Sequence, residues 1–240
     1  MKHLLILFIL SPFLLISQIN WKEVKPKDFL IAIQEFEESI PFGENYSLET
    51  TYDIFKNSSD DLPVQSTKGV LTCRNGNELN VFQMGFIMVQ DDRLNLTIDT
   101  VNQQIVIQKP DSSLFYRKTV NDVAVFSEMT EVIYKRVAQE KIIYSLELKN
   151  GYPYRAIELE FSGKEMISKI VIYSNQPYIA ENFMDETNKA KIVINFTNFK
   201  KGKSVNLNSF KTISDYIIIR DVELIAIGRY KDFELIDLRN

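Results

Sequence analysis

The sequence contains very little histidine and cysteine, and this scarcity limits the chemistry open to the chain. Its only histidine is His3 and its only cysteine is Cys73. His3 lies in a segment that we expect to be removed on export, so the mature protein would contain no imidazole. Cys73 has no second cysteine for a disulfide and no histidine to lower its pKa. Most hydrolytic triads and common zinc sites are therefore excluded. A histidine-free hydrolase with a pair of carboxylates is the enzymatic alternative, and the composition favours binding over catalysis.

Long hydrophobic runs are absent after residue 16. Residues 1–18 combine a short basic start, an apolar run over Leu4–Ile16 and the small residue Ser17, which predicts a cleavable signal peptide cut after Ser17 or Gln18. A retained anchor is the alternative, but a helix over this run is only ~20 Å long against a hydrocarbon core of ~30 Å. We therefore expect a soluble periplasmic protein with one domain, residues 19–240.

An excess of positive charge is also absent. The chain has 28 Lys and Arg against 32 Asp and Glu, a net charge of −4. Nucleic-acid partners need a basic face that replaces phosphate counterions, so none is expected. The acidic pairs Asp60-Asp61 and Asp91-Asp92 lie in predicted turns without the spacing of a calcium loop, and we expect no metal and no cofactor.

Aromatic residues are abundant, and the first apolar pattern along the chain is that of a helix. The chain has 16 Phe and 11 Tyr, which provide large areas for burial. Pro26 is a good first residue for a helix over Lys27–Ile40, in which Phe29, Ile33 and Phe36 form one apolar stripe. This stripe is either a packed core face or the lid of a cavity.

From Tyr46 onward the apolar spacing changes to two, which is typical of strands. Asn75-Gly76 predicts a hairpin between the strands Lys68–Arg74 and Glu78–Gln90. A return to helical spacing predicts a second helix over Val120–Glu140. The order of elements predicts an α+β fold that is mostly antiparallel β, with helices packed on one face of a meandering sheet.

The predicted strand over Val81–Val89 is apolar on both faces. It is either a central strand beneath a helix or part of the lining of a ligand cavity, since Met and Phe adapt well to apolar ligands. No catalytic residue is predicted. The candidate ligand-lining residues from this strand and the two helices are Phe29, Ile33, Phe36, Phe82, Met84, Phe86, Met88, Met129 and Ile133.

Three lysines, Lys200, Lys201 and Lys203, form the densest basic cluster. At a turn between strands they are either a solvated hairpin tip or a contact for anionic headgroups or an acidic partner.

The segment Ala190–Asp215 resembles the late hairpin of the outer-membrane lipoprotein carrier (LolA/LolB-like) superfamily. The hairpin Leu94–Lys109, with Ile98-Asp99-Thr100 before its second strand, is similar as well. The order of signal, helix, meander, helix and meander also agrees over about residues 20–215. In the first segment the matching residues are Asn195, Phe196, Asn198, Phe199, Asn206, Ser209 and Phe210.

The resemblance implies a curved half-barrel sheet with helices on its concave face, and an apolar cavity that holds acyl chains in the periplasm without catalytic residues. The cavity-locking arginine of that superfamily has no clear counterpart here, and the tail over residues 217–240 extends beyond the match. The leading hypothesis is a non-enzymatic carrier of a lipid or of an acylated, lipoprotein-like ligand, acting as a monomer. The alternative is a cell-envelope interaction module with a filled core that docks on an envelope protein.

Overall fold

The computed structural model describes residues 21–39, 43–83, 85–110, 128–138, 140–163, 166–177, 189–220 and 223–239, so the expected signal peptide lies outside the described residues. Thirteen strands form one sheet in the order β1-β8-β9-β10-β11-β12-β2-β3-β4-β5-β6-β7-β15, and β13 pairs with β14 separately. The strands are β1 (Lys22–Glu23), β2 (Tyr46–Phe55), β3 (Gln65–Arg74), β4 (Glu78–Gln83), β5 (Phe86–Gln90), β6 (Asn95–Asp99), β7 (Gln104–Gln108), β8 (Thr130–Ala138), β9 (Lys141–Leu148), β10 (Tyr154–Ser162), β11 (Met166–Pro177), β12 (Lys189–Lys201), β13 (Ile217–Arg220), β14 (Glu223–Ala226) and β15 (Glu234–Asp237).

The sheet is open and almost entirely antiparallel, which confirms the predicted strand-dominated class. Only β15 pairs in parallel, with β7, at one end of the sheet. Among the described residues there is one α-helix, α1 (Pro26–Ser39), so several helices on one face are not seen. Short 3-10 turns, η5 (Gly202–Ser204), η6 (Ile213–Asp215) and η7 (Gly228–Tyr230), lie in the C-terminal part.

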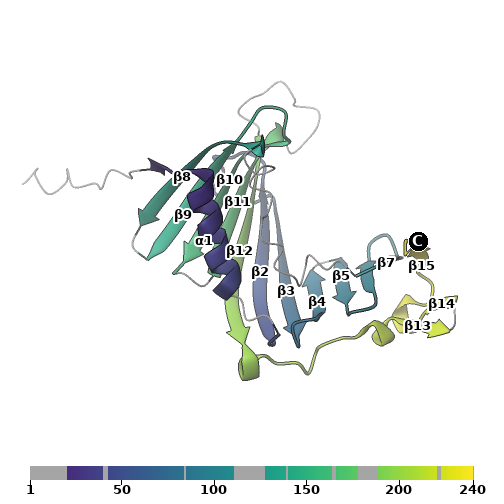
Figure 1. The fold of residues 1–240 in the computed structure, drawn as a ribbon. Coiled ribbons are helices and arrows are strands. Elements are labelled where there is room, and N and C mark those ends of the chain that lie inside the picture. The colour runs from purple at the N-terminus through teal and green to yellow at the C-terminus, as the bar shows by residue number, and fades with distance from the viewer. Residues whose placement is uncertain are drawn as a thin grey trace, which may run out of the picture.

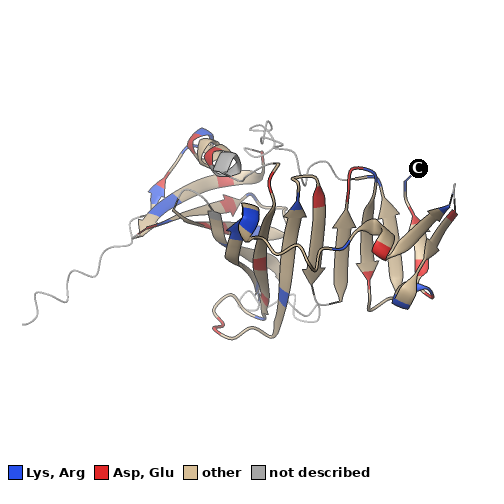
Figure 2. Ribbon diagram, turned by 90° about the horizontal axis from the view of Figure 1, so that it is seen from below, with Lys and Arg blue, Asp and Glu red and all other residues tan. Residues whose placement is uncertain are grey.

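The sheet bends into two arms (Figure 1). The first, which we name the α1 arm, contains β8–β12 with α1 lying across it. The second, the C-terminal arm, contains β4–β7 and β15, with the hairpin β13–β14 beside it. Strands β2 and β3 join the two arms, and the row of strands is clear from below (Figure 2).

The two arms are covered on opposite faces of the sheet. Antiparallel partners share a face, so the register assigns each side chain to one side. The side on which α1 packs is named the helix face. Following the pairing from β10 through β11, β12, β2 and β3 to β7 places Ile87, Ile98 and Ile105 on the other side, named the strap face.

On the helix face, α1 packs through a small aromatic core. Phe29 is 2% exposed, and its ring centroid lies 5.1 Å from that of Tyr144, which in turn lies 5.8 Å from that of Phe161. Both contacts are edge-to-face, the arrangement that aromatic rings favour. Ile33 packs against the same cluster. The predicted helix and its inward stripe are thus confirmed for these two positions.

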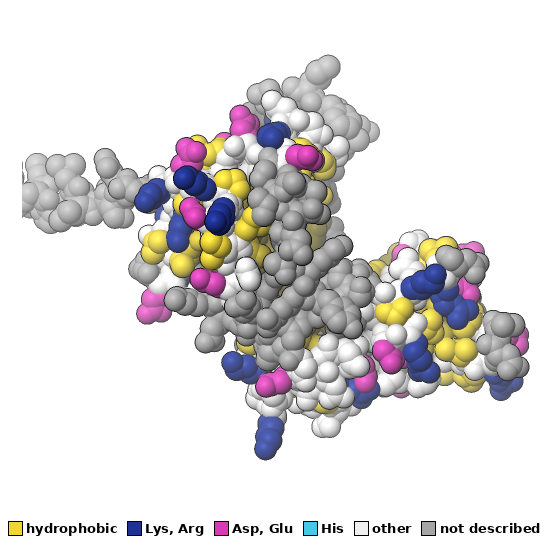
Figure 3. All heavy atoms as spheres, in the orientation of Figure 1, with side chains coloured by type: hydrophobic (Ala, Val, Ile, Leu, Met, Phe, Trp, Pro, Cys, Tyr) yellow, Lys and Arg dark blue, Asp and Glu magenta, His cyan; other side chains and the backbone are white. Residues whose placement is uncertain are grey.

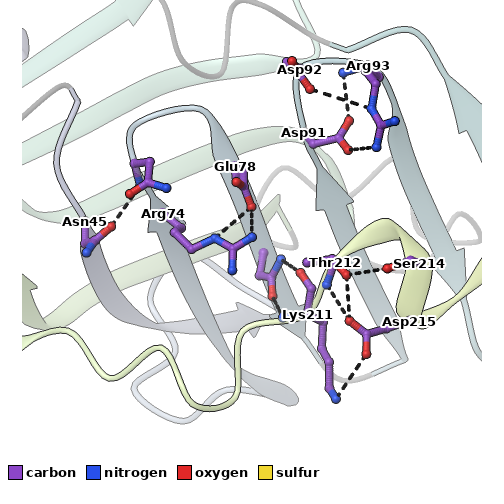
Figure 4. Close-up of polar contacts among 12 residues, drawn as sticks. Asn45, Arg74, Glu78, Asp91, Asp92, Arg93, Lys211, Thr212, Ser214 and Asp215 are labelled. Atoms are coloured by element: carbon purple, nitrogen blue, oxygen red, sulfur yellow. Dashed lines mark hydrogen bonds and ion pairs between the residues drawn. The ribbon is translucent and has the colours of Figure 1, made fainter.

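On the strap face, residues 202–216, which we name the strap, run from β12 to β13 and lead into the core of the C-terminal arm. Ile213, Tyr216 and Ile217 pack there against the isoleucines of β5–β7. The side chain of Asn80, fully buried in β4, donates to the carbonyl oxygen of Lys211 (2.7 Å) and accepts the Lys211 backbone N–H (2.6 Å). Figure 4 shows the polar contacts around this attachment.

The predicted second helix over Val120–Glu140 is wrong where the structure describes it. Residues 120–127 and 139 lie outside the described residues, but Thr130–Ala138 forms β8. Its β-branched and aromatic side chains, Val132, Ile133 and Tyr134, favour a strand, and pairing with β9 on the sheet outweighs the helical spacing.

The predicted single strand over Glu78–Gln90 is also wrong. It is the hairpin β4–β5, which turns at Gly85 with a φ of 77°. The turn reverses the alternation, so Phe82 pairs with Ile87 on the strap face, whereas Met88 pairs with Val81 on the helix face. The side chains of Phe82, Phe86 and Met88 therefore do not share one face.

Among the described residues, no helix combines the length and the apolar character that crossing a membrane requires.

Candidate functional site

Two rows of apolar side chains cross the helix face of the α1 arm and form what we name the apolar floor. Each row runs through β10, β11, β12 and β2 in direct register. The first row is Ile157, Ile172, Ile192 and Ile54; the second is Leu159, Ile170, Ile194 and Tyr52. At the β9 side the rows continue into Leu146 and Tyr144 beneath α1.

The sequence of β11 and β12 explains why this surface is apolar although it is not sealed. Both strands are apolar on both sides, as in Ile170-Val171-Ile172 and Ile192-Val193-Ile194. Val171 and Val193 point to the strap face, where each is 7% exposed in a small core with Phe55. The isoleucines on the helix face are only half-buried, as are the other members of the floor. The floor therefore keeps apolar surface that a ligand can still cover.

A pocket of about 300 Å³ lies beside α1 at the start of the second row. Ile31, Ala32, Tyr144 and Phe161 give it apolar walls, and Asp28, Glu35 and Lys135 stand at its sides together with Ile142 and Gly163. Ile31 is 46% exposed. Figure 3 shows hydrophobic side chains among charged ones on this arm. The volume is at the lower limit for small-molecule sites, so this pocket suits one end of a ligand that extends over the floor.

The floor itself contains no ionisable side chain except Tyr52. Burial raises the pKa of Tyr52, and the nearby phenol of Tyr154 raises it further, so Tyr52 stays neutral at physiological pH. Within the part of the chain that the structure describes, no group of three His, Cys, Asp or Glu side chains is placed to hold a metal ion. A surface of this composition offers a ligand burial as its means of attraction, and none of the eight side chains of the floor is placed to activate a nucleophile.

The structure brings three of the nine predicted lining residues together. Phe29 and Ile133, each 2% exposed, pack with Ile33 under α1, which makes them core residues at the end of the floor. The remaining predicted lining residues are not part of this cluster. Phe82 packs on the strap-face core. Phe86 and Met88 lie on the helix face of the C-terminal arm, and Met129 is half-buried beside β9, where its carbonyl oxygen accepts the N–H of Lys149. Met84 and the side chain of Phe36 lie outside the described residues.

Sequence reasoning missed the isoleucines of β11 and β12. The signal was present, because a strand that is apolar on both sides must be covered or must bind something on each side. That argument was applied to the segment over Val81–Val89, which is a hairpin. Applied to Ile170-Val171-Ile172 and Ile192-Val193-Ile194, it would have identified half of the floor.

The cysteine, the aspartate pairs and the lysine cluster each lie in surroundings that fit a structural role. Cys73 is 1% exposed, and burial raises the pKa of its thiol, which keeps it protonated and poorly nucleophilic. Asp60 and Asp91 accept backbone N–H groups in their own turns, from Asn57 and from Leu94. The lysine cluster lies exposed where β12 ends and η5 begins.

No family model matches the chain, and no curated protein matches it by sequence. Solved structures are similar to this chain at low levels, among them the following three. An uncharacterized conserved protein from Thermus thermophilus has a TM-score of 0.44 at 9% identity, with 88% of this chain and 99% of that chain covered. A LolA superfamily protein from Nitrosomonas europaea has a TM-score of 0.32 at 9% identity, covering 79% and 98%. A putative outer membrane lipoprotein-sorting protein domain from Vibrio parahaemolyticus has a TM-score of 0.31 at 10% identity, covering 78% and 97%.

The superfamily named by the sequence resemblance is thus also found among the structural matches. Likeness at this level is remote, so the function has to be inferred from the residues of the chain itself.

Proposed function

We propose that this protein is a periplasmic, non-enzymatic carrier that holds a lipid or an acylated, lipoprotein-like ligand against the apolar floor. The observation that carries the proposal is the pair of register-aligned rows whose members are apolar yet half-buried. An acyl chain lying along these rows would cover the surface that the fold leaves accessible.

The energy of burial is sufficient without a charged anchor. Burying a 14-carbon chain at ~0.8 kcal/mol per methylene contributes on the order of 10 kcal/mol before the cost of association. Association costs at least about 4 kcal/mol of this gain, so the acyl chain has to be covered along most of its length for binding to be measurable. A flexible chain also fits a floor assembled from many equivalent isoleucine side chains.

The test uses residues 19–240 and 1-palmitoyl-lysophosphatidylcholine, with native mass spectrometry for bound mass and thermal unfolding for stabilisation. Ile172→Asp places a carboxylate in the middle of the floor, and should weaken binding at least about tenfold because the charge loses hydration when the chain covers it. Ile194→Asn is the milder second floor variant.

The matched control is Val70→Asp on β3. Val70 is 42% exposed and points to the strap face, so the variant adds the same charge away from the floor and should bind within about twofold of wild type. A wild-type protein that binds no lipid and gains no thermal stability from it would refute the carrier proposal in favour of an interaction module with a filled core. Equal losses in Ile172→Asp and Val70→Asp would refute the floor as the site.

A further inference from the structure

A second pocket, of about 500 Å³, lies on the strap face of the C-terminal arm, on the other arm and face from the apolar floor. We name it the strap pocket, because the strap lines it with Lys211, Asp215 and Tyr216. Phe82 of β4 contributes from the sheet, and residues 227–230, which include η7, complete the lining. The volume lies within the range of small-molecule sites.

The walls of the strap pocket are largely aromatic. Tyr216 and Tyr230 are 4% and 5% exposed, with their ring centroids 5.3 Å apart, and Tyr230 also packs edge-on against Phe233. These contacts hold the two tyrosine rings in place. Phe82 and Ile227 are only half-buried, so they keep apolar surface that a ligand can still cover.

An arginine with a fixed orientation also lines this pocket. The guanidinium carbon of Arg229 lies 4.8 Å from the centroid of the Tyr230 ring, and its Nη2 donates a hydrogen bond to the Tyr230 hydroxyl. In the part of the chain that the structure describes, no carboxylate forms an ion pair with Arg229. A guanidinium carries five N–H donors, so most of them stay available to a ligand. Tyr230 therefore orients a positive charge without neutralising it.

The other charged groups of the strap pocket offset each other. Nζ of Lys211 lies 3.7 Å from Oδ1 of Asp215. Oδ2 of Asp215 accepts the backbone N–H and the hydroxyl of Thr212, at 2.7 and 3.0 Å (Figure 4). Both carboxylate oxygens of Asp215 thus have partners, and Lys211 balances its charge. The charge that remains is that of Arg229, so the pocket suits an anion.

We propose that the strap pocket is a separate ligand site that binds an organic carboxylate with an apolar body. The carboxylate pairs with Arg229, and the body covers Phe82 and Ile227. The planar fork of a guanidinium matches a carboxylate through two parallel hydrogen bonds, and one uncompensated cation matches its single charge. A free fatty acid and the C-terminus of a peptide that ends in an apolar residue share this chemistry.

The test measures the binding of octanoate and of its uncharged analogue octanamide to residues 19–240 at neutral pH, by chemical-shift titration. The wild-type protein should bind octanoate at least about tenfold more tightly, since hydrogen bonds between charged groups are the strong ones. Arg229→Gln should remove this preference and keep the affinity for octanamide within about twofold, which also shows that the pocket stays folded. Arg220→Gln removes the same charge from an exposed position of β13 outside the pocket lining, and should keep the full preference.

A second pair of probes, N-acetyl-leucyl-leucine and its C-terminal amide, distinguishes the two sources. If octanoate binds more tightly than the peptide acid, the ligand is a fatty acid; the reverse order identifies a peptide C-terminus. In either case the shifted amides should lie in residues 209–216 and 227–230.

Equal binding of acid and amide in both pairs by the wild-type protein would overturn this inference. So would a preference for the acid that survives in Arg229→Gln, or one that Arg220→Gln also abolishes. Shifts confined to the strands of the apolar floor would overturn it as well. Each of these results leaves the carrier function standing, because that function depends on the other arm and face.

Discussion

Replacing Asn80 by alanine should make the strap open from the sheet more often while leaving the α1 arm unchanged. Asn80 is fully buried, and its side-chain amide makes two short hydrogen bonds to the backbone of Lys211, at 2.7 and 2.6 Å. The amide thus bonds Lys211 as a neighbouring strand would. Close by, the guanidinium carbon of Arg74 lies 4.4 Å from the ring centroid of Phe210, a second and separate contact that the variant retains.

The cost follows from the two bonds. Each hydrogen bond contributes about 1 kcal/mol net, and the unpaired backbone groups of Lys211 add part of their desolvation cost, for a total of about 2–3 kcal/mol. A loss of that size corresponds to about a 30- to 150-fold rise in local opening.

Amide hydrogen exchange measures this opening directly. Peptides covering residues 207–217 should exchange about 30- to 150-fold faster in Asn80→Ala, whereas peptides from α1 should be unchanged because their core lies on the other face and arm. The control is Asn77→Ala, an exposed position in the adjacent turn, which should stay within about twofold of wild type. Unchanged exchange over residues 207–217, or equal acceleration in α1, would refute the reasoning.

Three further effects are expected. Ile98→Ala, at a side chain with no exposed surface, should lower the free energy of unfolding in urea by about 2–4 kcal/mol through the cavity it creates. Gly76→Ala should destabilise more than Gly151→Ala in thermal unfolding: both have a positive φ, but only at Gly76 would the new Cβ lie 2.4 Å from the backbone nitrogen of Gly43. Burial raises the pKa of Tyr216 to about 12, so its contribution to stability is complete below about pH 10 and is lost as the pH rises to about 12. Tyr216→Phe should therefore remove up to about 1.4 kcal/mol per pH unit of that decline, measured by urea unfolding across the range.

For each of these three predictions, one experimental result would contradict it. A cost under about 1 kcal/mol for Ile98→Ala would mean that the surrounding side chains close the cavity. Equal losses of stability in the two glycine variants would mean that the close approach of Gly43 to position 76 has no effect on stability. A pH profile of Tyr216→Phe parallel to that of wild type would show that this hydroxyl has the same pKa in the folded and unfolded states.

Local signals in the sequence predicted local structure well. Asn75-Gly76 forms a hairpin turn with φ values of 53° and 72°, the conformation for which this dipeptide is selected. Pro26 begins α1, and Phe29 enters its core. These features depend on neighbours along the chain, so periodicity and turn chemistry were enough.

The errors arose where one residue changes the geometry of a segment. Gly85 turns an apparent strand into a hairpin, and the alternation of Phe82 and Met88 then refers to two strands instead of one. Ile133 satisfies a helical spacing equally well, but its partner in β9 decides that it is in a strand. An apolar run cannot by itself distinguish these cases.

The alignment of the floor residues into rows could not be predicted, for another reason. The rows exist because β2 pairs with β12, strands whose residues Asp53 and Asn195 are 142 positions apart. No pattern within either strand specifies that partner.

The position of β15 in the sheet also affects the rate of folding. The side chain of Gln104 donates a hydrogen bond to Glu234 of β15, 130 positions later, so this edge of the sheet is completed by a segment far away in the sequence. Contacts of such separation form slowly, because the intervening chain must be ordered before they add stability. Until β15 pairs with it, β7 has a free edge. The backbone at Ile105 and Ile107 can then pair with a strand of another molecule. Refolding of this chain should therefore be slow and sensitive to protein concentration, even if every local turn forms at once.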